Sequence, residues 1–158
     1  MVGLCLGGHN PAMRITRLPD KLRRFGELRF ADKWLFLRAV FWLGVARIWL
    51  VVVPFGKLAE RLSMEGGTNG ADPEVLERVK FAVSAAGANV PWRSDCFPQS
   101  IGGHRLLKSY GYSSTIHLGV EKGGEGELLG HAWLTCGETV VTGGDQLGRY
   151  VEIHRLGE

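Results

Sequence analysis

Three side chains in the second half of the chain are of the types that perform nucleophilic catalysis: Cys96, His131 and Asp145. Asp95 is a predicted N-cap, so Cys96 is expected in the first turn of a helix. The helix dipole and free backbone N–H groups there favour thiolate, the form that attacks carbonyls. The same N–H groups can hold an oxyanion. A lone cysteine in this setting is also typical of a small buried apolar residue.

His131 is the candidate general base. It lies in Gly130-His131-Ala132-Trp133, early in a predicted strand, where the preceding glycine leaves access to the imidazole ring. A histidine on a strand is, taken singly, more often a hydrogen-bonded structural residue than a base. The remaining histidines have weaker settings for catalysis.

Asp145 is the candidate partner that orients His131. If Gly137 and Glu138 form a two-residue hairpin loop, His131 faces Gly144 and Asp145 points to the wrong side of the sheet. One extra residue in the returning strand would set Asp145 directly opposite His131. We therefore expect a bulge at Gly143 or Gly144, which would bring the carboxylate within reach of the imidazole.

Other kinds of site are less favoured by the sequence. Cys96, His131 and Cys136 are three possible zinc ligands, but Cys136 comes five residues after His131 and so faces the opposite way on a regular strand. The glycine clusters lack the sequence and setting of a phosphate-binding loop. We expect no metal and no cofactor.

The elements that must position these residues follow from the hydrophobic pattern. Asp72 caps a helix that has Pro73 at its first position and closes at Gly87. The next helix begins near Cys96 and reaches Tyr110-Gly111. An alternating pattern then predicts strands over residues 112–121, 129–135, 139–142 and 150–154. Helices followed by an antiparallel meander indicate the α+β class.

Residues 20–63 form a basic and apolar helical segment. Trp34 to Phe55 is apolar apart from Arg38 and Arg47, which a single helix would place on opposite faces. We therefore expect two shorter core or interface helices, breaking near Gly44 and ending at Pro54, rather than a membrane span.

Length, charge and cysteine content set the broad class. The 158 residues suit one domain with an accessory segment, divided as a flexible tail (1–19), a docking segment (20–63), a linker (64–72) and a core (73–158). From Arg14 to Arg61 there are eleven Lys or Arg against four Asp or Glu. This predicts either an acidic partner or a solvated basic face; nucleic acid is not expected, because the segment is too apolar. Three widely spaced cysteines and no secretory signal fit a reducing, cytoplasmic compartment.

Several stretches together resemble one family. They are Ser94-Asp95-Cys96, the run from Arg105 to Tyr112, the strand Ile116 to Val120, the stretch from Gly130-His131-Ala132-Trp133 to Asp145, and the basic aromatic front from Leu22 to Leu62. They are similar to the transglutaminase-like cysteine peptidases of lasso-peptide biosynthesis. The His-Ala-Trp motif is shared by the wider transglutaminase-like superfamily, so the narrower resemblance rests on its combination with the front segment.

The resemblance implies a papain-like core, in which a nucleophile helix packs on an antiparallel sheet, with an N-terminal helical segment. It implies a leader peptidase with Cys96 as nucleophile, His131 as base and then acid, and Asp145 as orienter. Expected partners are the precursor peptide, a separate leader-recognition protein that docks on the aromatic front, and the macrolactam-forming cyclase. Membrane contact is possible but not favoured, so the expected location is the cytoplasm, with membrane association as the alternative. The alternatives are another transglutaminase-fold acyl transferase or deamidase, and a non-catalytic peptide-binding module.

Overall fold

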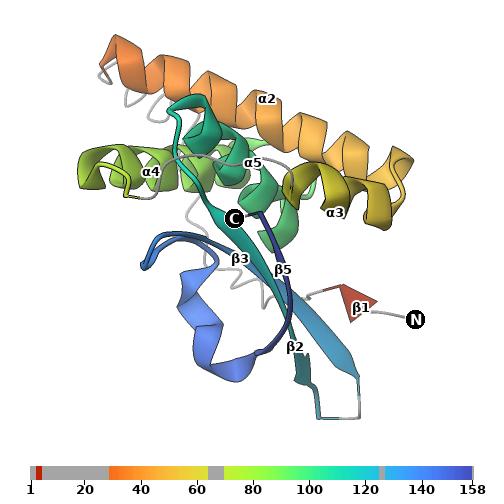
Figure 1. Cartoon of the computed structure of the whole chain (residues 1–158). Coiled ribbons are helices and arrows are strands. Elements are labelled where there is room, and N and C mark those ends of the chain that lie inside the picture. The colour runs from red at the N-terminus through yellow and green to blue at the C-terminus, as the bar shows by residue number, and fades with distance from the viewer. Residues whose placement is uncertain (1–2, 5–28, 64–69, 125–126, 158) are drawn as a thin grey trace.

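The computed structural model describes residues 3–4, 29–63, 70–124 and 127–157. After a short first strand, which pairs parallel to a later one, helices follow along the chain and then antiparallel strands. The helices are α2 (Phe30–Val52), α3 (Phe55–Ser63), α4 (Pro73–Asn89) and α5 (Cys96–Ser109). The strands are β1 (Gly3–Leu4), β2 (Thr115–Lys122), β3 (Leu128–Cys136), β4 (Thr139–Thr142) and β5 (Val151–Leu156), with a short 3-10 helix, η1 (Gly144–Arg149), before the last of them. The predicted α+β class is confirmed (Figure 1).

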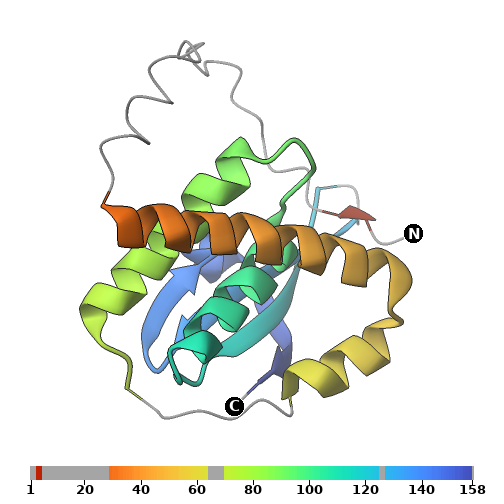
Figure 2. The same cartoon turned by 90° about the horizontal axis from the view of Figure 1, so that it is seen from above.

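The helices lie on one side of the sheet. α5 packs directly on the sheet, α4 packs beside it, and α2 crosses over both on the outside (Figures 1 and 2). Side chains from α2, α4, α5 and the sheet belong to one buried hydrophobic cluster, which includes Leu43, Val79, Ile101 and Leu134. The front segment from residue 30 onward is therefore packed into the same core as the residues that follow it. The predicted tail and linker fall largely outside the described residues.

Helix α2 differs from its prediction in one respect. It runs unbroken from Phe30 to Val52, so the expected break near Gly44 is wrong. A glycine in a helix costs only about 1 kcal/mol relative to alanine, and the Trp92 ring packs beside Gly44, 3.6 Å from where a Cβ would stand. The expected end at Pro54 is confirmed, because Val53 is already extended, as the residue before a proline prefers.

Helix α4 begins as the sequence predicts. The Asp72 side chain accepts a hydrogen bond from the backbone N–H of Glu74 at 2.8 Å, and Pro73 occupies the first turn. The helix continues two residues past Gly87, to Asn89. Its buried residues pack against α2 and α5 and fix the helical layer over the sheet.

Two adjacent glycines let α5 approach its neighbours on two sides. A Cβ at Gly102 would come within 3.1 Å of Leu43 in α2, and one at Gly103 within 2.6 Å of Leu134 in β3. The two glycines thus allow α5 to pack closely against side chains of both neighbours. Helix α5 therefore lies between α2 and the sheet, with Cys96 at its N-terminal end.

The sheet has the order β1-β3-β2-β5, and β4 also pairs with β3. β2 and β3 pair without interruption from Thr115–Thr135 to Lys122–Leu128. Since β2 occupies one edge of β3, β1 and β4 share the other edge. β1 covers Leu129 and Gly130, whereas β4 covers residues 134–136. Residues 131–133 lie between them and pair with no described strand on this edge; we call this stretch the edge gap of β3.

Candidate active site

Cys96 is the first residue of α5, and Asp95 is its N-cap residue, as predicted. The thiol-bearing residue is half-buried. The first amides of a helix have no acceptor within the helix, so the N–H groups of Cys96 and Phe97 point outward as possible oxyanion donors. The carboxylate of Asp95 does not cap the helix and lies instead 3.5 Å from the Arg93 guanidinium.

Ser100 ties the first turn of α5 to the end of β4. Its hydroxyl donates to the Cys96 carbonyl oxygen at 2.9 Å and lies 3.2 Å from the Thr142 hydroxyl. At the other end of the helix, His104 contacts the Ser114 hydroxyl just before β2. α5 therefore runs over the sheet with Cys96 beyond Thr142, toward Gly143 and the edge gap.

His131 lies at this gap and is held on two sides. Its Nε2 atom is 2.8 Å from the carbonyl oxygen of Gly143. The imidazole stacks on the Tyr150 ring, with centroids 4.7 Å apart, and on the Trp133 ring at 6.1 Å. Because a carbonyl oxygen can only accept, Nε2 carries the proton, and the neutral ring keeps its lone pair on Nδ1. An imidazole in this form can act as a base through Nδ1.

Cys96 and His131 approach the edge gap from different faces of the sheet. The Leu134 side chain packs toward Gly103 of α5, and strand side chains alternate between faces, so His131 and Trp133 face away from α5. No hydrogen bond joins the Cys96 thiol to the His131 imidazole, although the structure describes both residues. Thiol and imidazole therefore meet only if the ring turns around the strand edge at Gly143.

The predicted position of Asp145 requires a correction. β4 does contain one extra residue, but the register shift falls at Val141, between the pairs Thr135–Val140 and Leu134–Thr142. The strand then ends at Thr142 and Gly143 adopts a left-handed φ of 73°, so Asp145 is an exposed residue of η1 rather than the strand partner of His131. The two side chains, both of them described, are not hydrogen-bonded to each other.

A second histidine on the same sheet face escaped the sequence reasoning. His117 stacks on Trp133 with ring centroids 5.2 Å apart, contacts the Thr135 hydroxyl at 2.8 Å, and lies 3.4 Å from a carboxylate oxygen of Glu152. A hydrogen bond from Arg155 lowers the pKa of Glu152, with a smaller contribution from His117. The uninterrupted pairing of β2 with β3 places His117 opposite Trp133. The sequence could not predict this pairing, because it depends on the exact length of the turn between the two strands.

Cys136 lies on the other side of the sheet, with Leu134, and is buried. Its Sγ donates to the Ser113 carbonyl oxygen at 3.0 Å. Burial raises the pKa of the Cys136 thiol. This cysteine is therefore held as a neutral packing residue, on the face opposite to His131.

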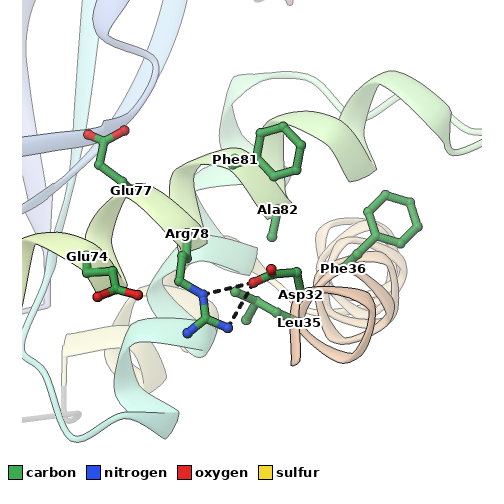
Figure 3. A pocket seen from close by; sticks show the side chains of 8 residues that line it. All are labelled: Asp32, Leu35, Phe36, Glu74, Glu77, Arg78, Phe81 and Ala82. Carbon is green, nitrogen blue, oxygen red and sulfur yellow. Dashed lines mark hydrogen bonds and ion pairs between the residues drawn. The ribbon is translucent and has the colours of Figure 1, made fainter. Parts of the chain in front are cut away.

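A pocket of about 440 Å³ lies away from this region, between the first halves of α2 and α4 (Figure 3). Phe36 and Phe81 flank it, and the Arg78 guanidinium reaches across to Asp32 with both contacts at 2.9 Å. The ion pair clamps the start of α2 onto α4. None of Cys96, His131 and Asp145 lines this pocket.

Comparison with known proteins gives one family. The model of the transglutaminase-like superfamily matches residues 39–155, from within α2 to β5, which is well over half of the chain. No curated protein and no solved structure matches the chain.

Proposed function

This chain belongs to the transglutaminase-like superfamily, and from that premise we propose that it is a cysteine peptidase that removes the leader from a lasso-peptide precursor. The superfamily includes cysteine peptidases and acyl transferases, which share attack of a thiolate on a carbonyl. The observation that carries the proposal is the anchoring of the Cys96 turn at the end of β4, one residue before the Gly143 carbonyl that holds His131.

In the proposed reaction the His131 ring first turns around the strand edge toward Cys96. It then takes the thiol proton of Cys96 through Nδ1, and the sulfur attacks the scissile carbonyl carbon. The negative oxygen is stabilised by the N–H groups at the start of α5. The imidazolium then gives its proton to the leaving amine, which departs as the N-terminus of the core peptide. Water, deprotonated by His131, hydrolyses the thioester of the leader and restores the thiol.

Asp145 is proposed to support the imidazolium electrostatically. Its place on η1, two residues after Gly143, keeps the carboxylate in the same turn as the hydrogen-bond acceptor of His131. This role requires η1 to shift when substrate binds, because the carboxylate has no direct contact with the ring in the structure. A negative charge beside an imidazolium stabilises the charged form during turnover.

The proposal also includes partners and a location. A separate leader-recognition protein would deliver the precursor, and a macrolactam-forming cyclase would use the freed N-terminus. The reaction would take place on the cytoplasmic side, where precursor peptides are made. The decisive experiment is mass spectrometry of a co-expressed precursor, with and without the recognition protein. Two fragments whose masses sum to the precursor plus one water are expected, and Cys96→Ala should abolish them.

Two other functions predict different products. An acyl transferase or deamidase would use the same thioester chemistry on a side-chain amide, so ammonia would be released from glutamine and the backbone would stay intact. A non-catalytic peptide-binding module is favoured by one observation, the packing of His131 between two aromatic rings. Such a module would bind the precursor equally well with Cys96→Ala and never cleave it.

A further inference from the structure

One face of α2 carries a row of exposed apolar side chains, interrupted for one turn at Gly44 and Val45. Each member is more than half exposed, the least being Leu37 at 51 %. The residues are spaced by three, four or seven positions, which places them on one side of a helix. This outer stripe consists of Phe30, Trp34, Leu37, Phe41, Ile48 and Val51.

The stripe is separate from the face by which α2 joins the core. Leu35, Ala39, Leu43 and Ala46 are buried against the rest of the protein, so α2 is apolar on two opposite sides. At 1.5 Å per residue, its 23 residues span about 33 Å. Trp92 packs beside Gly44 on the outer side. No described helix or strand covers the rest of that side, which is nearest the viewer in Figure 2. Six large apolar side chains exposed on one face of a helix mark an interaction site rather than chance exposure.

Basic side chains flank the stripe on both sides. At 100° per residue, Arg38 and Arg47 stand about a quarter turn from its centre, in opposite directions. Neither forms an ion pair with another described residue. The acidic residue of the first turn, Asp32, points inward to Arg78. The stripe is thus bordered by cations, while the one acidic residue of α2, Asp32, is paired with Arg78 on the inner side.

We propose that the outer stripe of α2 lies flat on an anionic lipid surface, with its aromatic and aliphatic side chains in the headgroup region and Arg38 and Arg47 reaching lipid phosphates. An amphipathic contact of this kind needs an apolar face with basic borders, and long arginine side chains can extend along apolar surface toward phosphate. A protein partner was the expectation from the sequence. Two cationic borders without accompanying acidic groups match an anionic bilayer better than a mixed protein surface.

The helix is long and apolar enough to cross a bilayer by length and composition alone. Crossing would require the face of Leu43 and Ala46 to leave the hydrophobic core that it shares with α5. Lying on the surface keeps that packing intact. We therefore expect peripheral binding that high salt or alkaline carbonate reverses.

The experiment is co-sedimentation of the full chain with vesicles of phosphatidylcholine alone and of phosphatidylcholine mixed with phosphatidylglycerol. We expect binding to the mixed vesicles, weakened by salt, with a blue shift of tryptophan fluorescence. Trp34→Ser with Phe41→Ser should abolish it. Arg38→Gln and Arg47→Gln should each weaken it about fivefold, because one cation near an anionic surface contributes about 1 kcal/mol. Val151→Ser with Ile153→Ser, which alters equally exposed apolar residues of β5, is the matched control and should bind normally.

Circular dichroism and thermal unfolding of each variant show that the fold is kept. Equal binding to both vesicle types, binding that survives the Trp34 and Phe41 changes, or resistance to carbonate extraction would each overturn the proposal. So would an absence of lipid binding together with a dimer that the stripe variant converts to a monomer, since that result would assign the stripe to a second copy of the chain. Cys96 takes no part in any of these outcomes.

Discussion

The Nε2 atom of His131 donates a hydrogen bond to the backbone carbonyl of Gly143, 2.8 Å away. A backbone group thus occupies the position that the sequence suggested for the Asp145 carboxylate. The bond fixes the tautomer, with Nδ1 free to accept a proton. It also joins the candidate base to the residue at which the chain leaves β4, so the conformation of Gly143 should govern both folding and activity.

Gly143→Ala should destabilise the protein more than the same substitution at Gly137, a glycine that has a positive φ but open space around it. Gly143 has φ 73°, and a Cβ there would lie 2.5 Å from the Ala132 carbonyl oxygen. Gly137, at φ 57°, has no atom within 4 Å of the same position. Gly137→Ala should therefore lower the free energy of unfolding by only the left-handed strain of about 1–2 kcal/mol. Gly143→Ala should lower it by this strain and also by the steric clash with the Ala132 carbonyl oxygen. Urea unfolding of both variants measures the difference; equal losses would mean that the Gly143 turn is not as tightly packed as found.

Tyr150 should act as a positioning residue for His131 through its ring. Tyr150→Ala removes the stacking contact, so kcat should fall about two- to tenfold with little change in KM, in line with the 0.5–1.5 kcal/mol of an aromatic pair. Tyr150→Phe keeps the ring and should restore kcat, which a role of the hydroxyl would not allow. Tyr110→Ala, at the exposed end of α5, is the control. A fall in kcat that Phe fails to rescue would contradict the stacking role.

Asp145→Asn should slow turnover less than His131→Ala. Loss of the base is expected to lower kcat by about 10²- to 10⁴-fold. With Asp145→Asn the Gly143 carbonyl still holds the imidazole, so only the electrostatic support of the imidazolium is lost. Steady-state kinetics on a leader-bearing peptide compares the two. An equal loss would show that the carboxylate contacts the ring during turnover and that η1 rearranges fully.

The order of elements was predictable because local signals mark it. Asp72 and Pro73 identify the start of α4, Gly137 and Glu138 the hairpin turn, and the change from helical to alternating pattern the passage from α5 to the sheet. Each of these features depends on a few neighbouring residues. They sufficed to place Cys96 at a helix start and His131 on a strand.

The relation of His131 to Asp145 was not predictable, because it depends on where a strand ends. The extra residue that hairpin arithmetic required is present, but at Val141, and the left-handed turn at Gly143 ends the strand before Asp145. The pair Gly143-Gly144 predicts irregular backbone, but it does not distinguish a bulge within the strand from a turn that ends it. Likewise Gly44 signals a break in α2, but the helix continues because Leu43 and Ala46 are buried in the core and Trp92 packs beside Gly44.

Cys96 and Cys136 should differ sharply in reactivity. Burial raises the pKa of Cys136, so less of its thiolate is present at neutral pH and its alkylation should speed up only as pH rises. Cys96 is half-buried at a helix start. In a Cys5→Ser background, limiting iodoacetamide should modify Cys96 first, as read by peptide mass mapping, and modification should track the loss of peptide cleavage. Cys96→Ala should lose both, while Cys136→Ser, the matched control, should keep both at some cost in stability. Cys136 is buried and is not expected to reach a peptide carbonyl, so its labelling should leave cleavage intact. Inactivation that follows labelling of Cys136 while Cys96 is still free would contradict the assignment of Cys96 as the nucleophile.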